Sequence, residues 1–365
     1  MSMNMARLDY ALLNLLRDNG DIALDGAVRQ VQIDSGEHLT FETVITEGDS
    51  PLESIRPPAL ALASELDSSM VQYLIVPHAR GDFLLAAWPT EHEGVYHLVS
   101  SVPHTDPRWQ KVERWVGRAR PTVVPCCLNH ADFVDIGRAL ADAGDAEVVR
   151  LTARNLVEEL SLHRGWKSRS GNLRPSPLQV IAEAEQNGES VRTMTIKVEN
   201  LLTIHIRRLA GATFYSGHFE LFKELVLDRL ASAVGSRRQL MADRQRRVGE
   251  PIGAPISIKL PDALLGDAVE TAEVINELEM LNRTSVAVMH RNPYLHVVVT
   301  DYADGSNFDV FVTDPSAIEI YPGFRASSGA LTRLSQQLGE RFLAIEIAQA
   351  IEDEAPTLDE LVVNG

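Results

Sequence analysis

The side chains with the clearest chemical potential in this sequence are arginines that gather near residue 240. The segment 237–247 holds five of them and one aspartate: Arg237, Arg238, Arg244, Arg246 and Arg247. A helix turns by about 100° per residue, so the first, third and last of these share a stripe and the other two point elsewhere. Such a stripe could meet a phosphate backbone, with an affinity that falls as salt rises. The alternative is a solvated helix end that pairs with an acidic helix expected over 267–279.

A second basic cluster surrounds a tryptophan in the segment 161–177. Its candidate contact residues are His163, Arg164, Trp166, Lys167, Arg169 and Arg174. Basic side chains interleaved with an aromatic ring suit a phosphate contact combined with base stacking. The segment is polar and rich in glycine and proline, which predicts a loop. A tryptophan between a glycine and a lysine can equally anchor such a loop onto a core.

Aspartates around a predicted turn are candidates for a site that binds a divalent metal ion. They are Asp301, Asp304 and Asp309, with Asp314 close by. Hard divalent ions need several oxygens within about 2.5 Å. The spacing fits no calcium loop, and Asp304-Gly305 can serve a hairpin turn alone. If these carboxylates held an ion while basic residues positioned a phosphate, the protein would be a metal-dependent phosphoester hydrolase.

The two cysteines, Cys126 and Cys127, are adjacent and precede His130. A thiol and an imidazole at a strand end could form a nucleophile pair, or contribute zinc ligands. Neighbouring residues of a strand point to opposite faces, so at most one cysteine shares the direction of the histidine. Buried, unreactive cysteines are the favoured interpretation.

Several common catalytic motifs are absent from the sequence. It contains no phosphate-binding loop, dinucleotide-binding glycine turn, H-E-x-x-H zinc helix, paired C-x-x-C knuckle, nucleophile elbow or kinase motif. We therefore expect no cofactor, and the sequence leaves open whether the protein is an enzyme.

Charge is strongly segregated along the chain, whose formal net charge is −17. Residues 104–247 carry 23 basic and 17 acidic side chains, a net charge of +6. Residues 1–103 carry 5 and 15, and residues 248–365 carry 6 and 19, which gives −10 and −13. Arginine outnumbers lysine by 29 to 5, which suits bidentate contacts to phosphate but also follows from a GC-rich genome.

The pattern of apolar residues predicts an α+β fold with mixed or antiparallel sheets and flanking helices. We expect three modules: 1–103 with a strand meander over 71–102, 104–247 with a basic α/β core, and 248–365 with a four-stranded antiparallel sheet. Helices are expected over 5–18, near 58–66, and as a closing element over 327–352. A β-α-β unit is expected over 123–152 and a hairpin over 193–207. A long helix is expected over 217–247, with a break possible at Gly235-Ser236.

These observations favour a non-catalytic binding or accessory protein that engages nucleic acid or another polyanion through the basic middle module. The alternatives are a protein-interaction scaffold or homo-oligomer, and the metal-dependent hydrolase. No apolar run approaches the roughly 18 residues of a membrane span, so no membrane association is expected. The lack of a secretory signal and of separated cysteines predicts a cytoplasmic location.

Overall fold

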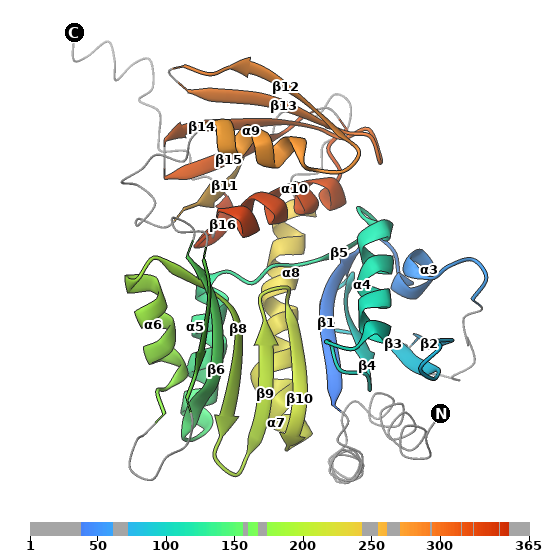
Figure 1. Ribbon diagram of the computed structural model, residues 1–365. Helices are drawn as coiled ribbons and strands as arrows, with labels where there is room; N and C mark the ends of the chain where they lie inside the picture. The colour runs from blue at the N-terminus through green and yellow to red at the C-terminus, as the bar shows by residue number, and fades with distance from the viewer. Residues whose placement is uncertain are drawn as a thin grey trace.

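The computed structural model describes residues 38–60, 72–155, 160–166, 174–242, 255–260, 271–292, 294–314, 316–323, 325–342 and 344–349. Its strands form two antiparallel sheets, one of ten strands and one of six, with helices packed against them (Figure 1). The predicted α+β class with antiparallel sheets is therefore confirmed. Within the part of the chain that the structure describes, no helix has the length and apolar character needed to cross a membrane. The helix expected over 5–18 lies outside the described residues.

One half of the ten-stranded sheet is the expected meander. Strands β2 (Gln72–Val76), β3 (Phe83–Pro89) and β4 (Val95–Ser100) pair in sequence, and β4 pairs with β1 (Leu39–Thr46). A short helix α3 (Pro51–Ile55) precedes the meander. Most of the helix expected near 58–66 falls on residues 61–71, which lie outside the description. Proline at the first turn of α3 explains this start, since its fixed φ suits that position.

The other half of this sheet follows β1 on its opposite edge. Its order is β10 (Gly211–Gly217), β9 (Leu202–Arg207), β8 (Glu189–Val198), β6 (Ala146–Asn155) and β7 (Ser161–Gly165). Strands β8 and β9 form the expected hairpin. The expected loop over 161–177 was wrong at its beginning, because β7 pairs with β6 as the edge strand of the sheet. An edge strand is solvated on one side, so its polar sequence does not prevent pairing.

The strand, helix and strand of the expected β-α-β unit all form, but the two strands do not lie next to each other in the sheet. Strand β5 (Val123–Pro125) leads into helix α5 (His130–Ala143), and β6 follows. However, β5 pairs with β1, whereas β6 lies between β8 and β7. The ten-stranded sheet thus takes strands from both the first and the second expected module, and the boundaries at 103 and 247 stay predictions.

Strand β1 has one edge shared by two partners, and this arrangement creates a fork. The first half of β1, through Glu42, pairs with β10, and the second half, from Val44, pairs with β5. Between them the amide of Thr43 donates to the carbonyl of Ala210 over 3.0 Å. Strands β5 and β10 therefore lie end to end along β1, and their chains leave the sheet at the same point.

Helices cover the two faces of the large sheet unequally (Figure 1). Helix α4 (Pro107–Ala119), capped by Asp106, packs with α3 over one face of the meander half. Helices α5, α6 (Pro177–Gln186), α7 (Phe219–Phe222), η1 (Lys223–Leu227) and α8 (Asp228–Ala242) carry apolar residues of the large core on the opposite face. Gly235-Ser236 does not break α8, since a single interior glycine costs a helix only about 1 kcal/mol. A Cβ on Gly235 would meet the His92 ring, so the glycine provides space there.

The second sheet is larger than the four strands expected. Strands β12 (Thr284–His290), β13 (Leu295–Asp301), β14 (Asn307–Asp314) and β15 (Ala317–Pro322) form the predicted antiparallel set. Strands β11 (Ile256–Lys259) and β16 (Glu346–Gln349) extend it beyond β15. Helices α9 (Thr271–Glu279) and α10 (Ser328–Arg341) contribute to its core. The closing helix thus ends earlier than expected, because residues 346–349 pair with β11 instead.

Helix α10 lies where the two sheets meet (Figure 1). It contacts α8 and β5 of the large sheet as well as α9 and β11 of the small one. The side-chain amide of Gln336 donates to Sγ of Cys126 over 3.1 Å. Consequently, one side of α10 faces the fork in the large sheet.

Candidate functional site

The structure pairs the described α8 arginines with carboxylates of this chain. Arg237 is 6% exposed, and its guanidinium donates to Asp132 of α5 and to the carbonyl of Ala233. Arg238 lies 3.4 Å from Glu93, which is itself highly exposed. Arg244, Arg246 and Arg247 lie outside the described residues.

The second basic cluster is also tied into the fold where it is described. Arg164 forms an ion pair with Glu189 over 2.6 Å, and Arg174 approaches Glu147 within 3.5 Å. Trp166 is partly buried against the large core, which matches the anchoring alternative. Lys167 and Arg169 lie outside the described residues. The structure therefore brings these described members together around one edge of the sheet, beside acidic partners.

The three aspartates of the β13–β14 hairpin have separate partners. Asp301 is buried and pairs with Arg333 over 2.7 Å, while Asp309 pairs with His296 over 2.7 Å. Asp304 accepts a hydrogen bond from the amide of Ser306, as expected for a turn residue. Among the residues that the structure describes, no group of three or more His, Cys, Asp or Glu side chains could hold a metal ion.

The cysteines are both buried, as the sequence favoured. Burial raises the pKa of Cys126 to about 11 and that of Cys127 to about 12, so both remain thiols at neutral pH. His130 instead lies 3.4 Å from Glu185. A low thiol pKa is the usual requirement of a reactive cysteine, and these environments have the opposite effect.

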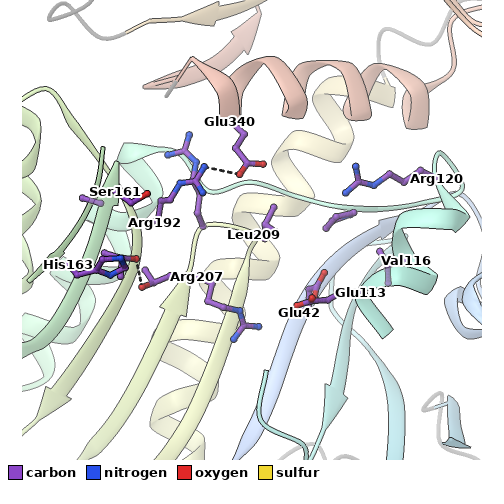
Figure 2. A pocket seen from close by; sticks show the side chains of 15 residues that line it. Glu42, Glu113, Val116, Arg120, Ser161, His163, Arg192, Arg207, Leu209 and Glu340 are labelled. Carbon is purple, nitrogen blue, oxygen red and sulfur yellow. Dashed lines mark hydrogen bonds and ion pairs between the residues drawn. The ribbon is translucent and has the colours of Figure 1, made fainter. Parts of the chain in front are cut away.

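A cleft of about 490 Å³ opens at the fork, between β1, the β9–β10 turn, α4 and α10 (Figure 2). We call it the fork cleft. Its lining residues are Glu42, Glu113, Val116, Arg120, Pro125, Thr152, Ala153, Ser161, His163, Arg192, Thr193, Arg207, Arg208, Leu209 and Glu340. Four of these are arginines and three are glutamates.

Much of the floor of the fork cleft is one row of paired residues across the sheet. In order along the row, these are His163, Thr152, Thr193, Arg207, Gly211 and Glu42. Directly paired residues of antiparallel strands project from the same face, so their side chains gather on one surface. Thr152 and Thr193 confirm this by approaching within 2.7 Å at their hydroxyls. The register of six strands thus aligns groups that are far apart in sequence.

Arg207 is held in a fixed position by the backbone of the floor. Its guanidinium donates to the hydroxyl of Thr213 over 3.0 Å and to the carbonyl of Phe41 over 2.9 Å. It lies across Gly211, where an added Cβ would overlap the guanidinium. Glycine at this position is therefore what allows the arginine to cross β10 and reach β1.

Glu42 is the acidic end of the row. It is 6% exposed, and burial raises its pKa to about 7, although the nearby charge of Arg207 opposes this increase. Glu113 of α4 adds to the increase through its own negative charge, and burial also raises the pKa of Glu113. The carboxyl group of Glu42 makes no hydrogen bond or ion pair with any residue that the structure describes. Its carboxyl group can therefore exchange a proton near neutral pH.

The opposite end of the fork cleft is basic and lies against α10 (Figure 2). Arg192 pairs with Glu340 over 3.2 Å. Arg208 donates to the hydroxyl of Ser190 over 2.5 Å and to the carbonyl of Gly339 over 3.2 Å. Arg120, at the end of α4, lies between the two ends and is influenced by the charges of both Glu42 and Glu340. Its guanidinium forms no ion pair and no hydrogen bond within the described part of the chain.

The sequence analysis singled out none of the glutamates and none of the arginines that line the fork cleft. The lining residues come from nine separate elements or turns between Glu42 and Glu340, so no local spacing links them. The one local signal was the Arg207-Arg208 pair at the end of a predicted strand. Of the candidate contact residues in the 161–177 cluster, only His163 lines the cleft.

Comparison with known proteins adds no family to this description. No protein-family model matches the sequence, and no curated protein matches it either.

Proposed function

We propose that this protein is a non-catalytic binding protein for a phosphate-bearing ligand, which it holds in the fork cleft. The observation that carries the proposal is Arg120, a partly buried guanidinium at the cleft that has no hydrogen bond or ion pair among the described residues. Burial lowers the pKa of Arg120, because desolvation disfavours the charged form of its guanidinium. An anionic ligand would supply the missing partner.

The charge balance of the fork cleft supports an anionic ligand. Its lining has four arginines against three glutamates, and the raised pKa of Glu42 reduces the negative charge further at neutral pH. Arginine contacts phosphate with two parallel N–H donors, and such charged hydrogen bonds are among the strongest in proteins. A volume of about 490 Å³ lies within the range of small-ligand sites.

A longer polyanion such as nucleic acid could present the same phosphate chemistry. The floor face continues from the fork cleft over β6 and β8, where Arg150 and Lys197 are exposed. In this version of the proposal, the expected polyanion contact of the basic middle module moves from α8 to the open face of the sheet. A small ligand and a nucleic acid share the phosphate group that the arginines would bind. The titration described next separates these two sources of phosphate.

The test is isothermal titration of the full-length protein with inorganic phosphate, pyrophosphate, and an oligonucleotide with or without a 5′ phosphate. We expect Arg120→Gln to weaken the binding of phosphate-bearing probes by about tenfold, because a charged hydrogen bond contributes about 1.5–3 kcal/mol. Arg118→Gln is the matched control, since Arg118 is exposed on the same helix and does not line the cleft. Equal affinities of the two variants, or no phosphate binding by the wild type, would overturn the proposal. Tight binding of the oligonucleotide alone would identify nucleic acid as the source.

A further inference from the structure

We infer that the six-stranded sheet binds an arginine-bearing basic segment of a partner protein, on the face opposite α9 and α10. This inference is independent of the fork cleft, whose floor is the large sheet. Alternate residues of β13 and β14, such as Val297 and Val310, belong to the core that the two helices share. The residues between them project from the other face, which we call the aromatic face after His296, Phe311 and Tyr321.

Two rows of paired residues cross the aromatic face. The first row includes one residue from each of the six strands: His290, His296, Phe311, Glu319, Ser257 and Ala348. The second row crosses four strands: Ala287, Val298, Asp309 and Tyr321. Directly paired residues of antiparallel strands project from the same face, so this register places aromatic rings and carboxylates side by side.

The rings of the aromatic face form a continuous stack. His296 lies nearly parallel to Phe311 with ring centroids 4.2 Å apart, and Tyr321 meets Phe311 edge-on at 5.3 Å. Beside the β12–β13 turn, His290 stacks on Tyr294 at 4.6 Å, and Tyr294 lies 6.4 Å from Phe311. Both His290 and Tyr294 are exposed. None of these rings belongs to a hydrophobic core of the described chain, so the stack is a surface that a partner can contact.

Two carboxylates lie within this stack, and each keeps one oxygen for a partner. One oxygen of Asp309 lies 2.7 Å from Nε2 of His296, and one oxygen of Glu319 accepts from the hydroxyl of Tyr321 over 3.3 Å. No described residue forms a hydrogen bond or ion pair with the other oxygen of either group. Because a guanidinium both stacks on aromatic rings and donates to carboxylates, this combination suits an arginine side chain.

The charge of the sheet favours a cationic partner over a nucleic acid. Strands β12, β13, β14 and β15 contain no arginine and no lysine. The segment to which they belong, 248–365, has a net charge of −13. Stacked rings can also receive nucleic-acid bases, but the phosphates would then approach Asp309 and Glu319 with no basic residue of these strands to offset the repulsion. A basic peptide is therefore the partner that the charges select.

The test is isothermal titration of the full-length protein with three peptides that alternate glycine with arginine, lysine or citrulline and carry blocked ends. Citrulline has nearly the shape of arginine but no charge. We expect the arginine peptide to bind the wild type about tenfold more tightly than the citrulline peptide, because charged hydrogen bonds are stronger than neutral ones. The lysine peptide should bind with intermediate affinity, since an ammonium group attracts carboxylates but cannot stack as a plane.

Two conservative variants connect this binding with the aromatic face. Asp309→Asn and Phe311→Leu keep a side chain of similar size, and each should weaken binding of the arginine peptide by about five- to tenfold. The matched controls are Glu273→Gln, which neutralises an exposed carboxylate of α9, and Tyr302→Ala, which removes an exposed ring at the β13–β14 turn. Both controls should bind the peptide as the wild type does.

Four outcomes would overturn the proposal. The first two are no binding of the arginine peptide, or equal binding of the arginine and citrulline peptides. The third is equal weakening by the variants and their controls, which would reduce the effect to the general charge of the segment. The fourth is a different occupant: single-stranded RNA whose binding Asp309→Asn strengthens and Phe311→Leu weakens, or a dimer in sedimentation equilibrium that Phe311→Leu dissociates.

Discussion

The contact between α5 and α8 and the fork cleft both use arginines from the same basic middle segment, but they use them differently. At the first contact, each arginine meets its own carboxylate: Arg237 meets Asp132, and Arg229 lies 2.9 Å from Asp135. At the cleft, Arg192 pairs with Glu340, Arg208 is influenced by the same carboxylate, and the guanidinium of Arg120 has no hydrogen bond or ion pair with a described residue. A local excess of arginine in a sequence therefore indicates a ligand only after the internal partners have been counted.

The two regions also differ in what their charges stabilise. Asp132 belongs to the capping box of α5 and accepts from the amide of Asn129 over 2.7 Å, so its pair with Arg237 joins a helix start to a neighbouring helix. The guanidinium of Arg120 forms no hydrogen bond or ion pair with a described residue, so it connects no two elements. Substitutions in the first region should affect folding, and substitutions in the second should affect binding.

The largest effect is expected from Arg237→Gln. Removing one member of a buried ion pair leaves the other charge without compensation and typically costs about 3–5 kcal/mol. We expect this decrease in the free energy of unfolding from urea denaturation at neutral pH. The matched control is the next residue: Arg238→Gln should cost less than about 1 kcal/mol, because its partner Glu93 is 89% exposed. Similar losses for both variants would show that pairing does not distinguish the two regions.

The second effect concerns pH and the acidic end of the cleft. The pKa of Glu42 is raised in the folded protein to about 7, from an ordinary value of 4.5. Its contribution to stability is therefore fully present below pH 4.5 and is lost as the pH rises toward 7. The loss is about 3 kcal/mol. We expect Glu42→Gln to be more stable than the wild type at pH 8, and nearly equal to it at pH 4.5.

Three buried histidines give the free energy of unfolding the opposite dependence on pH. Their contribution must be separated from that of Glu42. Burial lowers the pKa of His97 and His205 to about 3, and that of His104 to about 4. Their contribution is present above pH 6.5 and is lost as the pH falls, in both proteins alike. The difference between wild type and Glu42→Gln between pH 5 and pH 8 therefore isolates the glutamate. A constant difference over that range would show that Glu42 is ionised as in water.

The sequence predicted what depends on neighbouring residues. The meander over 71–102 and the β8–β9 hairpin follow from alternating apolar residues between turn signals. The turn at Gly305 was also predicted, and its φ of 81° is one that glycine adopts without strain. The last described strand, β16, was less predictable, because it is a strand only through its pairing with β11.

The fork cleft could not be predicted, because no short segment contains it. Glu42 occurs in a strand whose other residues are apolar or threonine, and only the register with β10 and β5 places it at the fork. Arg120 follows the end of α4, where a basic residue ordinarily interacts with the helix dipole. The same reasoning could not separate Arg237 from Arg238, since burial of neighbouring helix residues depends on what packs against each side.

The smallest effect, and the one that connects the two ends of the cleft, is expected from Gly211→Ala. The added methyl group would occupy the position of the Arg207 guanidinium, which is the flexible end of a long side chain and can move away. The strand should form as before, while the hydrogen bonds to Thr213 and Phe41 are lost, at a cost of about 1–3 kcal/mol. Once Arg207 is displaced, its positive charge no longer opposes the raised pKa of Glu42, so stability should fall over a higher pH range than in the wild type. Urea denaturation from pH 5 to pH 9 measures both quantities, and Arg207→Gln is the control that removes the charge without filling the space. If Gly211→Ala lost stability but kept the pH dependence of the wild type, Arg207 would serve only to hold β9 and β10 against β1, and the acidic end of the cleft would be set by burial alone.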